Sequence, residues 1–401
     1  MARTVAAASA RTARRDLSRS RMLDTPLLVA AAALVGLGLV MVASSSITIA
    51  ERELAAPFYY FKRQLLFVVL GVGCTVPVLL VPLEQWRRSG PVLLIGVLLL
   101  LSLVLMPGVG KEVNGSTRWL PLGVFYVQVS ELAKLFMVLY LAGYLVRRGD
   151  EVRASAGGFL KPVGLLALTC ALLLAEPDFG AAVVLLVTCF AMMYLAGVRL
   201  WQFGILVVLA AGALGALAFL SPYRWARVVS FLNPWADPYN SGFQLVQSLI
   251  AFGRGEWLGV GLGASVQKLF YLPEAHTDFL FAVIGEELGL AGTLGVIGLF
   301  ATIVWRACLI GARAERNGHW FAAYLAHGLG LWLGLQAFIN IGVNMGVLPT
   351  KGLTLPLMSY GGSSMVMSCV AVGLLLRAGY ENARAERDIG PGAGYTAGAR
   401  G

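Results

Sequence analysis

The residues best suited to chemistry lie in the stretch 271–289, which reads YLPEAHTDFLFAVIGEELG. His276 and Asp278 stand just before an apolar run, and Glu286 and Glu287 lie inside it. Ionisable side chains at membrane depth are costly, so they are functional candidates by default. A carboxylate at the end of a helix can serve as an acid or a base. The alternative is that Asp278 only caps the N-terminus of the following helix.

A helix that starts near residue 279 would place small residues on the same face as Asp278. These are Ala282, Gly285, Gly289 and Gly292, and such a stripe allows a neighbouring helix or an acyl chain to approach closely. In one straight helix, Glu286 and Glu287 would lie about 12 to 14 Å deeper in the membrane than Asp278. They would also point in other directions, so we expect them to pair with buried cations.

A second candidate is the pair Glu131 and Lys134, which are three residues apart in QVSELAK and share one helical face. A buried pair can simply neutralise itself. Alternatively it lines a cavity in which Lys134, together with Arg118 from the preceding loop, faces an anion. The spacing alone leaves both interpretations open.

A third candidate is the segment 348–364, LPTKGLTLPLMSYGGSS. Its prolines, its glycine pair and its hydroxyls predict a broken or re-entrant segment, which membranes permit only where it is buried or lines a cavity. Its backbone N–H groups, with Lys351 and Ser359, are suited to a phosphate. Asn340 and Asn344, one turn apart just before it, are expected to hydrogen-bond between helices.

These residues are embedded in a chain that is 58% hydrophobic and only 13% charged. Such a composition predicts a polytopic membrane protein, in which each crossing needs about 20 apolar residues. We expect an all-α fold with ten transmembrane helices, at roughly 26–47, 62–82, 90–106, 128–146, 161–176, 179–197, 202–220, 279–305, 321–343 and 357–379.

The distribution of basic residues sets the expected orientation. With the N-terminus inside, the inner segments hold 20 Lys and Arg and the outer segments hold 10, so both termini are expected in the cytoplasm. The net charge of +10 is then explained by topology and by attraction to the inner leaflet, and no nucleic-acid partner is expected. The five cysteines lie in apolar runs without the spacing of a metal site.

The chain is expected to form one membrane domain over residues 23–380. The tails 1–22 and 381–401 have compositions typical of disorder. A large extracytoplasmic loop, residues 221–277, separates the seventh and eighth helices and leads directly into Asp278. Long loops with structure of their own are usually functional.

Together, the motifs NGSTRWL, SELAKL, EPDFG, NPWADPYNSGFQLVQSLIAFGRGEWLGVGLG, LPEAHTDFLFAVIGEELG and TKGLTLPLMSYGGSS resemble the SEDS (shape, elongation, division, sporulation) family of bacteria. The resemblance extends over about residues 26–380. Two details, the Glu-Ala before His276 and the Thr-Lys-Gly before Leu353, are more similar to its cell-division branch than to its elongation branch.

The resemblance implies a peptidoglycan glycosyltransferase at the division septum that polymerises lipid II on the outer face of the bacterial cytoplasmic membrane. It implies that Asp278 is the essential carboxylate, and that Glu131, Lys134, Arg118 and Trp119 bind the diphosphate or sugar. Lys351, Ser359 and His276 join this set as candidate substrate-binding residues.

The partners implied are a class B penicillin-binding protein (an FtsI-like transpeptidase) and division membrane proteins of the FtsQ, FtsL and FtsB type. No organic cofactor or protein metal site is predicted, while a divalent cation, Mg²⁺ or Mn²⁺, at the lipid diphosphate is left open. Two other functions are also left open. One is a lipid II flippase, and the other is a scaffold that docks and activates the transpeptidase.

Overall fold

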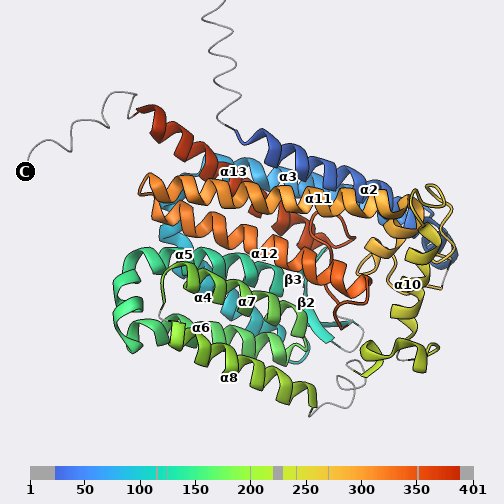
Figure 1. Cartoon of the computed structure of the whole chain (residues 1–401), viewed down its shortest axis with the longest axis horizontal. Helices are drawn as coiled ribbons and strands as arrows, with labels where there is room; N and C mark the ends of the chain where they lie inside the picture. The colour runs from blue at the N-terminus through green and yellow to red at the C-terminus, as the bar shows by residue number, and fades with distance from the viewer. Residues whose placement is uncertain are drawn as a thin grey trace, which may run out of the picture.

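The computed structural model describes residues 23–113, 116–123, 125–198, 200–219, 229–240, 242–269, 271–349 and 352–388. Long helices running side by side dominate it (Figure 1). Within these residues, eight helices are long and apolar enough to cross a membrane. Their bounds are α2 Thr25–Leu54, α3 Tyr59–Leu80, α4 Leu83–Val104, α5 Val129–Ala154, α6 Ala156–Ala175, α11 Leu280–Arg316, α12 Trp320–Asn344 and α13 Gly362–Asp388.

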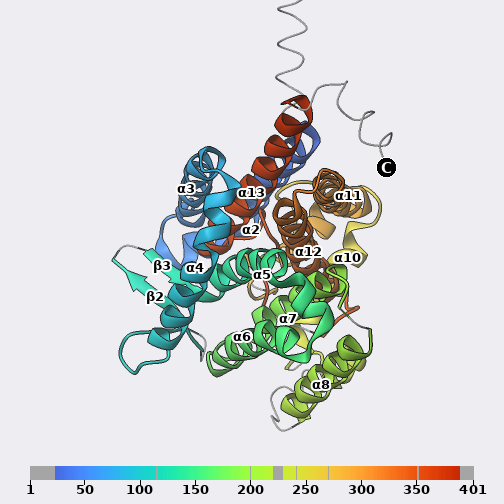
Figure 2. The same cartoon turned by 90° about the vertical axis from the view of Figure 1, so that its left-hand side faces the viewer.

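Two further apolar helices, α7 (Phe179–Leu195) and α8 (Leu200–Phe219), complete the set of segments expected from hydropathy. α8 lies at the margin of the bundle in both orientations (Figures 1 and 2). Side-chain caps mark several helix starts, as the sequence chemistry predicts. The carboxylate of Asp24 accepts from the N–H of Leu27 at α2, and that of Asp178 accepts from the N–H of Ala181 at α7.

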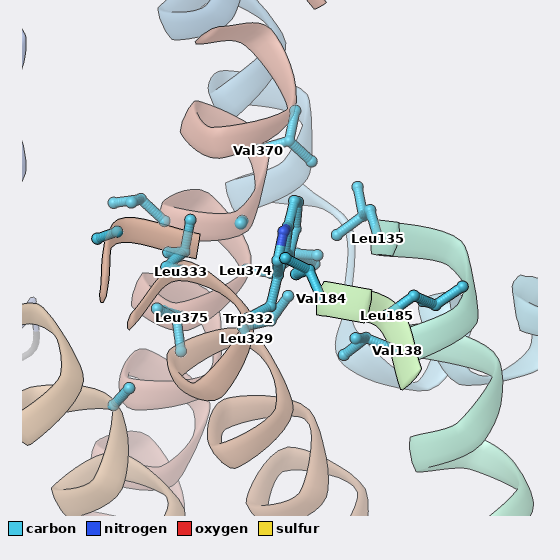
Figure 3. Close-up of a cluster of buried hydrophobic side chains, with 14 of the residues drawn as sticks. Leu135, Val138, Val184, Leu185, Leu329, Trp332, Leu333, Val370, Leu374 and Leu375 are labelled. Carbon is cyan, nitrogen blue, oxygen red and sulfur yellow. The ribbon is translucent and has the colours of Figure 1, made fainter. Parts of the chain in front are cut away.

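The buried centre of the bundle is the place where α5, α7, α12 and α13 meet. Trp332 of α12 is 1% exposed and lies among Leu135, Val184 and Leu374 from the other three helices (Figure 3). The indole N–H of Trp332 donates to Gln336 Oε1 at 3.0 Å. This apolar centre adjoins polar residues at one end of the bundle, beginning with Gln336.

The prediction of an all-α fold is wrong in the connection between α4 and α5, where three short strands form an antiparallel sheet in the order β1-β2-β3. The strands are β1 Lys111–Val113, β2 Ser116–Leu122 and β3 Phe125–Gln128. β-Branched and aromatic residues favour strands, and Leu122 pairs with Phe125 across a two-residue turn. Gly123 supplies the positive φ of +64° that such a turn needs.

The long connection between α8 and α11 contains the 3₁₀ turn η1 (Pro234–Ala236) and the helix α10 (Phe243–Gly255). This connection therefore has secondary structure of its own, and α10 is 13 residues long. At the other end of the chain, α13 continues to Asp388, so the expected start of a disordered tail at residue 381 is wrong. α13 also begins at Gly362 and not at residue 357, because residues 352–361 are not helical.

The helix that follows Asp278 is not continuous. Gly289 has φ +63° and ψ −160°, which interrupts α11, and we call its two parts α11a (Leu280–Leu288) and α11b (Leu290–Arg316). The Gly-rich loop after α10 fills the break and satisfies the backbone groups on both sides. Its bonds are Val260 N to Glu286 O, Gly261 N to Glu287 O, Leu290 N to Glu256 O and Ala291 N to Trp257 O, all at 3.0 to 3.1 Å.

The break changes the direction of the chain. α11b packs along α12, with Gly334 against Val304, and a straight α11 would carry Asp278 about 18 Å beyond Leu290. Instead the carbonyl of Asp278 accepts from Asn344 Nδ2 at 2.9 Å, in the last turn of α12. α11a is therefore turned back across the end of the bundle, and the predicted deeper position of Glu286 and Glu287 along one straight helix is wrong.

The small-residue stripe is covered by this chain itself. A Cβ added at Gly285 would lie 2.4 Å from the ring of Phe252 in α10, and one at Gly289 would lie 2.4 Å from the N of Gly259. The expected close approach of a neighbouring helix is confirmed. An acyl chain has no room beside these two glycines in this arrangement.

We predict that Gly289→Ala destabilises the protein, because an alanine there has a strained backbone and meets the loop that fills the break. The strain alone costs about 1–3 kcal/mol, so the apparent melting temperature in detergent should fall by several degrees. The matched control is Gly295→Ala in α11b, where an added Cβ meets nothing within 4 Å and helix propensity improves. Equal melting curves for the two variants would contradict the broken helix.

Candidate functional site

Asp278 is half-buried and lies two residues before the first residue of α11a. Its carboxylate faces the non-helical segment before α13, since a Cβ at Gly352 would stand 3.1 Å from Asp278 Oδ2. The capping alternative is wrong: Phe279 occupies the N-cap position without a side-chain bond. The N–H of Ala282 donates instead to Asn344 Oδ1 at 3.1 Å.

Two amides of α12 fix the main chain of Asp278. Asn340 Nδ2 and Asn344 Nδ2 both donate to its carbonyl, at 2.8 and 2.9 Å. Asn340 Nδ2 also donates to the carbonyl of Leu353 at 2.5 Å. The two asparagines are 2% and 0% exposed, so the expected hydrogen bonding between helices is confirmed, and its target is the backbone of the candidate residue.

The segment 352–361 is non-helical and is largely buried after the exposed Gly352, which confirms the predicted broken segment. Side-chain amides from other helices donate hydrogen bonds to two carbonyl groups of this segment. Gln336 Nε2 donates to the carbonyl of Thr354 at 3.0 Å, and Gln64 Nε2 donates to that of Ser359 at 3.0 Å. Ser359 is 3% exposed and its hydroxyl accepts from the N–H of Leu355, so in this structure Ser359 shapes the segment. Lys351 lies outside the described residues.

Glu131 and Lys134 form the expected pair, with Lys134 Nζ 2.7 Å from Glu131 Oε1. Lys134 is 1% exposed, and it also donates to Gln336 Oε1 at 2.7 Å. Gln336 therefore links Lys134 to the carbonyl of Thr354 through two hydrogen bonds. Thr354 follows Leu353, whose carbonyl accepts from Asn340. In this conformation the pair braces the segment 352–361, and direct contact of Lys134 with an anion stays a prediction.

Arg118 lies in β2 and fastens the sheet to the turn between α6 and α7. Its guanidinium donates to the carbonyls of Glu176 and Pro177, at 3.2 and 2.6 Å, and lies 3.8 Å from a carboxylate oxygen of Asp178. Trp119, the next residue of β2, is partly buried and pairs with Gln128 of β3. Both residues are therefore parts of the sheet in this structure, and contact of either with the substrate stays a prediction.

The turn 176–178 also packs against the buried segment. A Cβ at Gly180, just after the turn, would lie 2.9 Å from Leu353. Gln128 Nε2 donates to Asp178 Oδ2 at 3.2 Å. The main-chain N–H of Gln128 donates to the hydroxyl of Ser363 at 2.9 Å. The structure thus joins α5, α12, the sheet and this turn to residues 352–364. Sequence reasoning missed Gln64, Gln128 and Gln336, although an uncharged amide inside or beside an apolar helix is a signal for such a role.

His276, two residues before Asp278, lies in an aromatic cluster. Its ring is 4.6 Å from that of Tyr60 and 5.5 Å from that of Tyr360, and its carbonyl accepts from the N–H of Tyr360. Burial lowers the pKa of His276, while Glu274 and Glu53 act in the opposite direction. Neutral His276 is therefore the form that this packing favours.

Glu286 and Glu287 are both 0% exposed. The expected pairing with a buried cation holds for Glu287, while the cation beside Glu286 is exposed. Lys268, itself 6% exposed, lies 2.8 Å from Glu287, and Arg254 lies 3.1 Å from Glu286. The hydroxyl of Ser44 in α2 also donates to Glu287 at 2.7 Å. These contacts fasten the break in α11 to α2 and to the large loop, away from Asp278.

Comparison with known proteins shows the family. A family model described as a cell cycle protein, covering FtsW, RodA and SpoVE, matches residues 25–384. The chain belongs to this family. Relatives named probable peptidoglycan glycosyltransferase FtsW include those of Nitrosococcus halophilus, 62% identical over 358 residues (89% of this chain, 92% of that protein), and Halorhodospira halophila, 57% identical over 372 residues (93% and 94%).

Solved structures of the family have the same fold. A chain from a peptidoglycan synthase complex, described by its coordination of polymerization and crosslinking, matches with a TM-score of 0.72 and 31% identity, over 90% of this chain and 98% of that one. Rod shape determining protein RodA of Thermus thermophilus matches with a TM-score of 0.67 and 28% identity, over 90% and 97%. The SEDS resemblance of the sequence motifs is thereby confirmed.

Glu176 yields a prediction about pH. It is 0% exposed and neither carboxylate oxygen has a hydrogen-bond partner among the described residues. Burial, reinforced by Asp178, raises the pKa of Glu176 to about 8. The folded protein keeps this proton where the unfolded chain, with an ordinary pKa of 4.5, releases it. Stability should therefore fall as pH rises from about 4.5 to 8.

Glu176→Gln should remove this part of the pH dependence, because a neutral amide of the same size has no proton to release. We expect the variant to melt at a higher temperature than wild type at pH 8, with the difference shrinking toward pH 5. The measurement is the apparent melting temperature in detergent at several pH values. Asp150→Asn, at an exposed carboxylate, is the control; an equal change in both variants contradicts the assignment.

Proposed function

We propose that this chain polymerises lipid II into β-1,4-linked glycan strands at the outer face of the bacterial cytoplasmic membrane, during septal wall synthesis. The observation that carries the proposal is the half-buried carboxylate of Asp278, set against Gly352 by the broken helix α11 and by two buried asparagines. The relatives' common name supports the reaction type.

The proposed topology has ten membrane crossings with both termini in the cytoplasm. The eight long apolar helices supply most of them, and α7 and α8 supply the other two. The excess of basic residues on the inner segments supports this orientation. It places the sheet, α10 and Asp278 on the outer side, where the substrate's sugars would be.

In the proposed reaction, Asp278 acts as the general base. It takes the proton of the acceptor sugar's 4-hydroxyl as that oxygen attacks C1 of the donor sugar. The bond from C1 to the lipid diphosphate breaks, and its electron pair leaves with the diphosphate. Attack from the opposite face inverts C1 and gives the β-1,4 link, and no acid is needed because the diphosphate is a good leaving group.

The departing diphosphate requires positive charge or N–H donors. Lys134, Arg118 and Lys351 are the candidate cations, and Glu131 with Lys134 also braces the segment 352–361. Trp119, Ser359 and His276 are candidate contacts for the sugar or the diphosphate. Among the described residues, no three His, Cys, Asp or Glu side chains gather into a metal site. An Mg²⁺ or Mn²⁺ ion would therefore be held mainly by the diphosphate oxygens, whose charge it would neutralise.

The proposed partner is a class B penicillin-binding protein, an FtsI-like transpeptidase. The structural similarity to a chain from a peptidoglycan synthase complex supports this assignment. Membrane proteins of the FtsQ, FtsL and FtsB type complete the set of partners expected at the septum.

We predict that Asp278→Asn abolishes polymerisation, since a positioned general base contributes about a hundred- to ten-thousand-fold in rate. The assay is glycan synthesis from labelled lipid II in liposomes that contain the protein and its transpeptidase partner. Glu112→Gln, an exposed carboxylate in β1, should retain wild-type activity. Full activity of Asp278→Asn would remove the general-base role, and lipid II transport without glycan in wild type would favour a flippase.

Asn344→Leu tests how Asp278 is positioned. Leucine has a similar size but removes the donor to the Asp278 carbonyl and the acceptor for Ala282. A misplacement of about 1 Å can cost a hundredfold in rate, so kcat should fall by about ten- to a hundredfold with little change in KM. Tyr144→Phe, which removes a buried bond to Gly158, is the control. A change in KM alone, or an equal loss in the control, would count against positioning.

A further inference from the structure

A cavity of about 280 Å³ lies at the opposite end of the bundle from Asp278. It is formed where the first turn of α2 meets the last turns of α11b and α13, and these segments lie together in both orientations (Figures 1 and 2). Its polar lining includes Asp24, Arg306, Arg313, Asn382 and Glu386. With the topology proposed above, the cavity opens at the level of the inner-leaflet headgroups.

Two of the charged side chains in the cavity, Asp24 and Arg306, form an ion pair, and the other two, Arg313 and Glu386, are not part of it. Arg306 holds Asp24 with two bonds, Nε to Oδ1 at 2.8 Å and Nη2 to Oδ2 at 2.7 Å. Arg313 makes no side-chain hydrogen bond or ion pair with any described residue, and Glu386 accepts from Asn317 Nδ2 at 2.9 Å. The cavity therefore offers a guanidinium and a carboxylate that are not bonded to each other.

A buried amide provides a second, independent sign of a ligand. Asn382 is 3% exposed, and its Oδ1 is 2.8 Å from His319 Nδ1, a residue outside the cavity lining. The opposite atom of the same amide, Nδ2, is buried without a hydrogen-bond partner. An unsatisfied buried donor costs about 1–3 kcal/mol, so an acceptor placed in this cavity would relieve it.

Apart from Thr25, the remaining lining is apolar, and exposed apolar side chains stand close to it in the sequence. Ile310 and Pro26 line the cavity. Leu28, one turn along α2, and Trp305, next to Arg306, are 45% and 60% exposed, as expected of side chains that face lipid. A ligand with a charged head and an apolar tail matches this arrangement better than a soluble ion does.

We propose that this cavity binds the headgroup of an inner-leaflet phospholipid that carries both a phosphate and a primary ammonium. Arg313 and Asn382 hold the phosphate, because guanidinium and amide N–H groups are suited to its oxygens. Glu386 accepts from the ammonium. The four charged side chains sum to zero, which favours a zwitterionic headgroup over an anionic one, although basic pockets between helix ends commonly take anionic lipids.

The test is a titration of the full-length protein in detergent with short-chain phosphatidylethanolamine, followed by its apparent melting temperature. Phosphatidylglycerol, phosphatidylcholine and inorganic phosphate are titrated in parallel. We expect saturable stabilisation by phosphatidylethanolamine, at least about fivefold weaker binding of the other two lipids, and no effect of phosphate. Phosphatidylcholine should bind less well because its quaternary ammonium has no N–H to donate to Glu386.

Arg313→Gln and Glu386→Gln should each weaken this binding by about fivefold to tenfold. Arg316→Gln is the matched control, since Arg316 is an exposed cation on the same helix end outside the lining. Native mass spectrometry of retained lipid provides a second readout that does not depend on stability. An equal response to all three lipids, or no difference between Arg313→Gln and Arg316→Gln, overturns the proposal. Equal stabilisation by inorganic phosphate overturns its assignment to a lipid.

Discussion

The structure depends on one constraint: in a hydrocarbon environment, every backbone N–H and C=O needs a partner within the protein. Regular helices satisfy this requirement without help, and interruptions do not. At Gly289 the Gly-rich loop 256–261 supplies the missing donors and acceptors on both sides of the break. In the segment 352–361, the side chains of Gln64, Gln336 and Asn340 do so. Both of these departures from a helix are thus accompanied by a dedicated set of partners.

The same apolar environment makes a buried carboxylate costly unless a cation lies beside it. Glu131, Glu286, Glu287 and Asp24 are each held by a nearby cation, which offsets part of the cost of burying charge. The main chain of Asp278 is fixed by two neutral amides that donate to its carbonyl. Its carboxylate faces Gly352 in the non-helical segment before α13.

The long apolar runs predicted the helices well, since hydrophobic length is the dominant signal in a membrane chain. The motifs also located Asp278, the Glu131–Lys134 pair and the broken segment before α13. The course of α11 could not be predicted, because the reversal depends on the loop that caps Glu286 and Leu290, about 30 residues away along the chain. The sheet was missed for a related reason: strands of three to seven residues give weak periodicity, and pairing across the sheet defines them.

Both sites considered above occur where helices end or break, and this location has a physical reason. Inside a helix, the backbone groups are already bonded to each other and only side chains at fixed spacing remain for a ligand. At α11a and the segment 352–361, the chain leaves that geometry, so main-chain and amide groups can be directed at one point beside Asp278. At the other end, the terminal turns of α2, α11b and α13 bring charges from three separate helices around one cavity. The regular centre around Trp332 is buried, and both proposed sites lie away from it, toward the two ends of the bundle.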